Sequence, residues 1–227
     1  MLDAVRGRLI VSCQALEDEP LHSPFIMGRM ANAAKQGGAV AIRAQGIEDI
    51  IEIKKVTELP VIGIIKRNYE NSEVFITPTK KEIDELLTSR CEMIALDATN
   101  RKRPNNENLK EIINYIKSNN VLVMADISNY EEAIRAYEYG ADCVSTTLAG
   151  YTSYTKCIDG PDFELTERLV KDLKIPVIAE GRINTPQDLE KVFNLGAYSA
   201  VVGSAITRPQ LITEKFAKVV SKTLELA

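Results

Sequence analysis

The sequence predicts a (β/α)₈ barrel, the TIM-barrel fold, in which eight parallel strands form a closed ring surrounded by helices. Apolar runs typical of buried strands alternate with amphipathic runs to the end of the chain, and the strand-like runs number eight. No segment rich in Pro, Gly or Ser divides them, so we expect residues 1–227 to form a single barrel domain. An open, doubly wound sheet is the alternative, but the even count and a final helix at 210–226 that would complete the ring favour closure.

The expected strands are rich in β-branched and apolar residues. In chain order they are 8–15, 39–45, 60–67, 92–99, 121–128, 141–148, 176–183 and 198–206. Helix-like segments with a polar face lie between them, among them 80–90, 106–120, 129–140, 162–173 and 185–196.

Local signals mark the ends of several helices. We expect Thr185 to cap a helix ahead of Pro186, and Gly140 and Gly196 to end helices just before the next strand. The longest segment with neither pattern is 149–162. Because loops of this length in compact domains are usually functional or mobile, we expect it to close over a site.

Composition excludes several classes of protein. The formal net charge of -4 and the pI near 5.3 give no basic footprint for a nucleic-acid partner. Four cysteines form no CxxC pair and His22 is the only histidine, so we expect no disulfide framework, no metal and no cofactor, in a reduced, cytoplasmic setting. No uninterrupted apolar run approaches the roughly 18 residues of a membrane span. The sequence allows a homodimer.

Polar residues gather where the expected strands end, which in such a barrel is the catalytic mouth. They are Gln14, Arg43, Gln45, Lys66, Arg67, Asp97, Asn100, Asp126, Thr146, Thr147, Glu180, Arg182 and Ser204. Each alone is typical of a paired charge at a strand end. Together they indicate a site, because burying charge is costly unless it is matched. Asp97 fits equally a site carboxylate and a turn residue.

Lys66 ends the apolar run "PVIGIIKR" at 60–67. Apolar surroundings would lower the pKa of its amine, so that a neutral base is available near pH 7. The alternative is a structural salt bridge from Lys66 to Glu180 or Asp126 across the barrel mouth.

A phosphate site is predicted after the last two strands. Gly181 and Gly203 follow apolar runs, with Arg182 and Ser204 next to them, where barrels commonly bind phosphate through backbone N–H groups. Arg208 follows and can add a charge-assisted contact.

These motifs carry a family resemblance. "IVSCQA", "AIRAQG", "IGIIKR", "ITPT", "ADIS", "STTLAGYT", "IAEGRI" and "VVGSAITRP", spread from residue 10 to 209, resemble the bacterial N-acylmannosamine-6-phosphate 2-epimerases. The resemblance implies a (β/α)₈ barrel that interconverts N-acetylmannosamine 6-phosphate and N-acetylglucosamine 6-phosphate in amino-sugar and sialic-acid catabolism. It also implies that the family's catalytic lysine is Lys66 and that its acidic partner is Glu180.

The chemistry of that reaction fits the residues. Inverting C2 requires removing a proton made acidic by the C1 carbonyl of the open-chain sugar and returning one to the other face. Lys66 can be the base, and Glu180 can carry the second proton or assist ring opening. Arg43 and Gln14 are expected to steady the enolate oxygen, and Asp126 and Thr147 to bind the sugar.

The sequence is compatible with two other functions. A class I aldolase would use Lys66 as a Schiff-base amine toward a phosphorylated or keto-acid substrate. A non-catalytic sugar-phosphate-binding barrel would keep the glycine turns and Arg208 but would not need Lys66 and Glu180 to converge. The metal-dependent pentose-phosphate epimerases depend on histidine ligands that this chain lacks.

Overall fold

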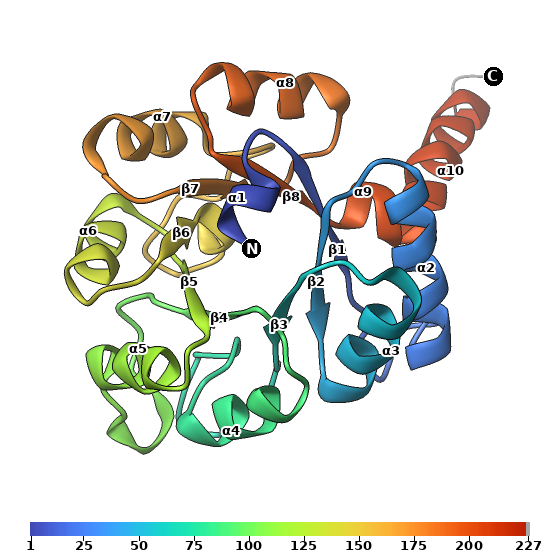
Figure 1. Ribbon diagram of the computed structural model, residues 1–227. Helices are drawn as coiled ribbons and strands as arrows, with labels where there is room; N and C mark the ends of the chain where they lie inside the picture. Colours follow the sequence, from blue (N-terminus) through green and yellow to red (C-terminus); the bar gives the residue numbers. More distant parts are fainter. Residues whose placement is uncertain (226–227) are drawn as a thin grey trace.

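Eight parallel strands close into one barrel in chain order, which confirms the predicted fold (Figure 1). The computed structural model describes residues 1–225, and the side chains of residues 1–220. Each strand pairs with the next, and β8 pairs with β1. The strands are β1 (Leu9–Cys13), β2 (Ala41–Gln45), β3 (Val61–Ile64), β4 (Met93–Asp97), β5 (Leu122–Asp126), β6 (Cys143–Ser145), β7 (Val177–Glu180) and β8 (Ser199–Val202).

Helices surround the barrel (Figure 1). They are α1 (Leu2–Val5), α2 (Pro24–Gln36), α3 (Ile47–Thr57), α4 (Lys80–Thr88), α5 (Leu109–Ser118), α6 (Tyr130–Glu138), α7 (Phe163–Asp172), α8 (Pro186–Asn194), α9 (Ser204–Thr207) and α10 (Pro209–Glu225), with 3₁₀ turns η1 (Pro104–Asn106) and η2 (Thr146–Leu148). The expected end signals are confirmed. Thr185 forms a capping box at the start of α8, and Gly140 and Gly196 follow α6 and α8 with φ of 90° and 91°.

Alternation along the strands separates two apolar layers. Ile10, Ile62 and Met124 belong to a buried cluster inside the barrel, whereas Val11 and Ile94 belong to the cluster between the strands and the helices. Successive side chains of a strand point to opposite faces, so every second residue points inward.

The two ends of the barrel differ. Val5 of α1 belongs to the inner cluster, and α1 lies across the end of the barrel from which the strands start (Figure 1). The other end, where the strands finish, therefore remains as the place for a site.

Several strands end earlier than predicted. Lys66 lies beyond β3, because the chain folds back and pairs Lys66 with Ile76 in an antiparallel bridge. Thr146 and Thr147 form the turn η2 instead of continuing β6, and Ser204 begins α9 instead of lying within β8.

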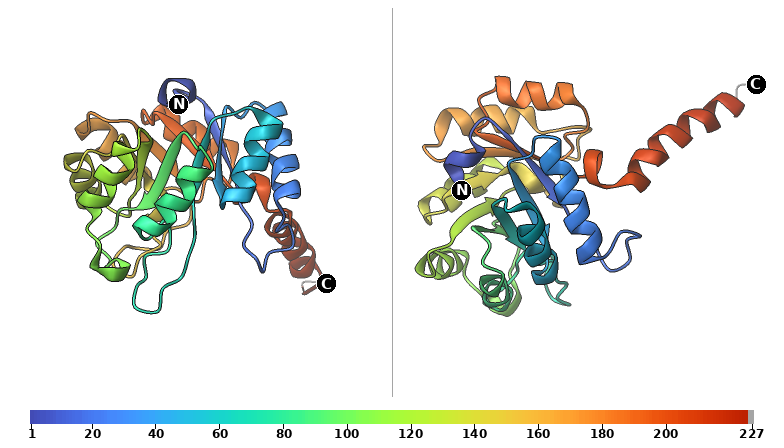
Figure 2. Two further views of the ribbon diagram at one scale, coloured as in Figure 1. Left: turned by 60° about the horizontal axis from the view of Figure 1, so that its bottom comes forward. Right: turned by 45° about the vertical axis from the view of Figure 1, so that its right-hand side comes forward.

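The expected final helix does not complete the ring. The short α9 follows β8, and α10 then projects away from the barrel (Figure 2). Phe216 is 73% exposed and Val220 is 61% exposed on it. The last residue of the expected helix, 226, lies outside the described residues. Within the described part of the chain, no helix has both the length and the apolar composition needed to cross a bilayer.

Candidate active site

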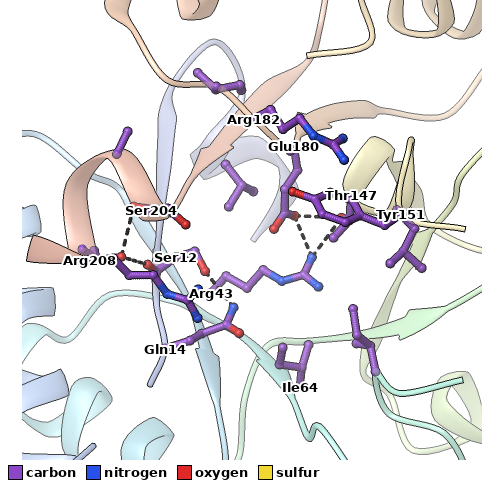
Figure 3. Close-up of a pocket in the computed structure, with 18 of the residues that line it drawn as sticks. Ser12, Gln14, Arg43, Ile64, Thr147, Tyr151, Glu180, Arg182, Ser204 and Arg208 are labelled. Carbon is purple, nitrogen blue, oxygen red and sulfur yellow. Dashed lines mark hydrogen bonds and ion pairs between the residues drawn. The ribbon is translucent and has the colours of Figure 1, made fainter. Parts of the chain in front are cut away.

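A cavity of about 470 Å³ opens where the strands end, a size typical of a small-molecule site (Figure 3). Nearly all of the predicted site residues line it. These are Gln14, Arg43, Lys66, Thr147, Glu180, Gly181, Arg182, Gly203, Ser204 and Arg208. Residues from six of the eight strand ends, far apart in sequence, therefore meet at one place.

Arg43 is the centre of the charge cluster in the cavity. It points into the barrel from β2 and is only 1% exposed. Its Nη2 donates to Asp126 Oδ2 at 2.6 Å, and its Nη1 donates to Glu180 Oε2 at 2.7 Å. Burial acts to lower the pKa of Arg43, but the two carboxylates outweigh it and raise that pKa. Arg43 is therefore held as a permanent cation.

Asp126 lies behind Arg43 and does not line the cavity. It is fully buried, and its two carboxylate oxygens accept hydrogen bonds from Arg43 and Thr147. This arrangement differs from the expectation that Asp126 holds a sugar hydroxyl. Asp126 instead orients Arg43 from the side away from the cavity, because its oxygens bind the guanidinium and it does not line the cavity.

Hydrogen bonds hold both the backbone and the carboxylate of Glu180. Thr146 Oγ1 accepts from the backbone N–H of Glu180 at 3.0 Å and donates to its carbonyl oxygen at 2.9 Å. Thr147 Oγ1 lies 3.0 Å from Glu180 Oε2, and its single hydroxyl hydrogen is shared between Glu180 and Asp126. Burial raises the pKa of Glu180, with Asp126 acting in the same direction and Arg43 opposing it. At a given pH, a larger fraction of Glu180 is therefore protonated than of a free glutamate.

Lys66 points into the cavity because it continues the inward alternation of Ile62 and Ile64 beyond the end of β3. The returning chain covers it: Phe75 and Ile76 line the same cavity, and Lys66 Nζ lies 6.0 Å from the centre of the Phe75 ring. Burial lowers the pKa of Lys66 to about 8, with Arg43 and Arg208 acting in the same direction. A substantial fraction of this amine is therefore neutral near pH 7.

The neighbour of Lys66 has a different environment. Arg67 forms ion pairs with Glu82 and Glu85 of α4 and does not line the cavity. Asp97 also lies outside it: its Oδ1 accepts from the backbone N–H of Thr99 at 2.9 Å and its Oδ2 from Arg101 at 2.5 Å. Of its two interpretations, these contacts are those of a turn residue.

The predicted phosphate residues lie together after β7 and β8. Gly181 has φ of 105°, a conformation that favours glycine. Gly203 lies close to β1, where an added Cβ would be 3.3 Å from Ser12 Cβ. No backbone acceptor within the described residues takes the N–H groups of Gly181 or Gly203. Arg208 Nη2 donates to Glu19 Oε2 at 2.9 Å, which fixes the guanidinium at the same end of the cavity.

Arg182 uses its side chain elsewhere. Its Nη1 and Nη2 donate to the carbonyl oxygens of Ala149 and Gly150 at 2.7 and 2.9 Å. The guanidinium is therefore committed to the loop after β6, and only the backbone of Arg182 is left for the predicted phosphate contact.

Several cavity residues were not predicted, among them Ser12 and Tyr151. Ser12 lies two residues before Gln14 and so has the same inward direction, a signal that strand alternation alone would have supplied. Tyr151 lies within the loop 149–162 that was expected to close over a site, and it lines the cavity. Within the described residues, no group of three or more His, Cys, Asp or Glu side chains is placed to hold a metal ion.

Comparison with known proteins agrees with this geometry. Residues 27–222 match the profile of a family described as "Putative N-acetylmannosamine-6-phosphate epimerase". A protein of Clostridioides difficile (strain 630) named "Putative N-acetylmannosamine-6-phosphate 2-epimerase" is 80% identical over 97% of this chain and 99% of its own length. The solved structure of the N-acetylmannosamine-6-phosphate 2-epimerase from Clostridium perfringens is 68% identical, with a TM-score of 0.95 and 96% of each chain covered. A thiamine phosphate pyrophosphorylase from Pyrococcus furiosus, 20% identical with a TM-score of 0.60 over 96% of each chain, shares the fold.

Proposed function

The chain belongs to the N-acetylmannosamine-6-phosphate epimerase family, and from this premise we propose how it inverts C2 of its substrate. It is an isomerase that interconverts N-acetylmannosamine 6-phosphate and its C2 epimer, N-acetylglucosamine 6-phosphate. We assign the first proton transfer to Lys66 and the support of that transfer to Glu180 and Arg43.

The observation that carries the proposal is that Lys66 and Glu180 line one cavity with a buried cation between two carboxylates. The neutral amine of Lys66 removes the C2 proton of the open-chain sugar, and the electron pair moves into the C1 carbonyl to form an enolate. Protonation at the opposite face of C2 gives the epimer. Glu180, whose pKa is raised by burial, can supply that proton or pass a proton during ring opening.

The enolate oxygen needs a hydrogen-bond donor that is already in place. Gln14 lines the cavity and donates its amide to Ser12 Oγ at 2.7 Å, which fixes its orientation. Nε of Arg43 has no partner among the described residues, while both Nη atoms are committed to carboxylates. The second amide hydrogen of Gln14 fits the role expected for Gln14, whereas Nε of Arg43 is buried, so Arg43 acts on the enolate through its positive charge.

The substrate's phosphate belongs at the other end of the cavity. Arg208 and the backbone N–H groups of Gly181, Arg182, Gly203 and Ser204 supply positive charge and donors there. Holding this remote group orients C2 toward Lys66.

Heavy water tests the assignment of the base. Turnover in heavy water should place deuterium at C2 of the product, because a proton taken by a lysine exchanges with solvent. Lys66→Ala should abolish the exchange while sugar-phosphate binding persists, because the phosphate donors lie on other elements. C2 exchange that persists in Lys66→Ala would move the base to Glu180.

Borohydride separates the epimerase from the class I aldolase. Borohydride added during turnover should link no substrate to the protein, because proton abstraction forms no imine. An aldolase-type imine would be reduced and trapped on Lys66. A substrate adduct on Lys66 would reject the epimerase mechanism.

We also propose a homodimer that uses α10. The exposed apolar side chains of Phe216 and Val220 lie on a helix that projects from the barrel (Figure 2), and a second copy presents the same surface. Light scattering should give twice the chain mass for the wild type and for Lys218→Gln, whose side chain is 67% exposed on the same helix. Phe216→Glu should give the single-chain mass; a monomeric wild type would reject the dimer.

Three further expectations complete the proposal: the whole chain is one domain, it acts in the cytoplasm, and it binds no nucleic acid. The four cysteines are free, and three of them are buried, which suits a reducing compartment. The net charge of -4 gives no basis for binding a polyanion.

A further inference from the structure

Arg182 is bent back onto the loop after β6. It is a non-glycine residue with φ of 53°, directly after Gly181 and two residues after Glu180. Such a backbone conformation is unfavourable for a side chain with a Cβ and persists where the surroundings hold it. The surroundings here are the carbonyl oxygens of Ala149 and Gly150, both bound by the guanidinium.

The loop is shaped to receive this guanidinium. Gly150 has φ of 73°, and an added Cβ would lie 3.0 Å from Arg182 Nη1 and 3.0 Å from the carbonyl oxygen of Lys156. The next residue, Tyr151, places its ring on the guanidinium, with 3.8 Å from Arg182 Cζ to the ring centre. One side chain thus fixes three consecutive loop residues.

The loop is also attached farther along. Tyr154 Oη donates to Glu132 Oε1 at 2.7 Å, and Glu132 is fully buried. Thr152 and Thr155 share a hydrogen bond of 2.7 Å within the loop. Tyr151 therefore occupies a defined position at the cavity, although its side chain is 55% exposed and its hydroxyl has no partner among the described residues.

The position of Tyr151 relative to the phosphate residues suggests what it contacts. Arg208 and Ser204 lie on one side of Arg43 and Tyr151 lies on the other (Figure 3). In the substrate the phosphate is on C6 and the acylated nitrogen is on C2, so the two groups lie toward opposite ends of the open chain. With the phosphate at Arg208, the acyl group extends toward Tyr151.

We propose that Tyr151 contacts the acyl group on C2 of the substrate and limits its size, and that Arg182 is the positioning residue that holds Tyr151. This inference rests on the proposed function and deepens it. Leu148, three residues before Tyr151 in the chain, also lines the cavity and adds apolar surface to its wall. Removing the ring would leave space for a longer acyl chain.

Substrates with lengthened acyl groups test the proposal. We would measure kcat/KM for N-acetyl- and N-butanoyl-mannosamine 6-phosphate and compare the ratio between variants. The wild type should discriminate against the butanoyl substrate. Tyr151→Ala should raise the butanoyl-to-acetyl ratio at least about tenfold, since one methylene in an apolar pocket changes specificity by about 10–200-fold. Tyr151→Phe should keep the wild-type ratio, because the hydroxyl has no partner.

Arg182→Lys tests the positioning role. Lysine keeps the charge but lacks the planar, forked guanidinium, so both carbonyl contacts and the ring stacking weaken. The ratio should shift in the same direction as in Tyr151→Ala, and the double variant should shift it no further than Tyr151→Ala alone. A lower melting temperature without a change of the ratio would show that Arg182 is only structural and would overturn its assigned role.

The chain supplies a matched control. Arg168 of α7 stacks on Tyr130 of α6 with 3.5 Å from Cζ to the ring centre, and neither residue lines the cavity. Arg168→Lys and Tyr130→Phe should leave the acyl ratio unchanged. An unchanged ratio in folded Tyr151→Ala would overturn the inference alone, whereas a wild type inactive on N-acetylmannosamine 6-phosphate would overturn the proposed function.

Discussion

The titration of Lys66 should control the pH dependence of the reaction. Its pKa is lowered to about 8, chiefly by burial and then by Arg43 and Arg208. At pH 7 about one tenth of such an amine is neutral, against about 3 in 10,000 for a lysine with a pKa of 10.5. The environment thus increases the population of the active base by about 300-fold.

The expected profile follows from that pKa. Below pH 8 kcat/KM should rise about tenfold per pH unit, and above it the profile should level off. Measurements between pH 6.5 and 9.5 avoid the second ionisation of the substrate phosphate near 6. A flat profile across this range, which a base with a pKa below 6 would give, would refute Lys66 as the base and would suit a carboxylate.

The same shift predicts an effect on stability. Because the pKa of Lys66 is lower in the folded state, the unfolded state binds more protons between pH 8 and 10.5, so stability rises with pH in that window. Below pH 8 the buried ammonium of Lys66 lowers the free energy of unfolding by at most about 3 kcal/mol. Solvent screening reduces this cost, because the side chain is partly exposed. Urea unfolding of Lys66→Met should show a gain over the wild type at pH 7 that disappears near pH 10.5. If Lys66→Met does not raise the free energy of unfolding at pH 7, burial does not destabilise the ammonium.

Three further results are expected. The kcat/KM of unphosphorylated N-acetylmannosamine should be at least about a hundredfold below that of the phosphorylated sugar, a loss of roughly 2.7 kcal/mol in transition-state stabilisation. Arg208→Gln should reduce this difference in kcat/KM between the two sugars. Equal kcat/KM values would mean that the glycine turns bind no phosphate. Activity should survive exhaustive treatment with EDTA, since Asp126 and Glu180 both bind Arg43, and loss restored by a divalent ion would contradict metal independence. Asp126→Leu should lower the free energy of unfolding by about 3 kcal/mol, because it leaves Arg43 with one carboxylate partner, whereas Lys218→Gln on exposed α10 should cause no measurable change.

The sequence alone was sufficient for the fold and for every charged residue that lines the cavity. Strand and helix periodicities, with caps such as Thr185, are local properties of the chain and predicted the barrel before any contact was known. Because the strands of a barrel finish at one end, the positions of Lys66, Glu180 and Gly203 at the ends of their strands were enough to predict that they lie together.

Tertiary structure decided the matters that depend on contacts between distant segments. The return of the chain at Ile76 ended β3 early and covered Lys66, and the pairing of Arg43 with Asp126 placed that carboxylate behind the cavity. Neither follows from periodicity, because a carboxylate at a strand end has the same sequence pattern whether it faces substrate or an arginine.

The final helix and Arg182 differ from expectation for the same physical reason. The apolar pattern of α10 predicts a helix, but only the geometry after α9 directs it away from the barrel. The sequence places Arg182 beside the phosphate glycines, while its backbone conformation and the carbonyl oxygens of Ala149 and Gly150 turn its guanidinium toward Tyr151. Sequence patterns thus determined which residues reach the mouth of the barrel, and long-range contacts determined what each side chain touches there.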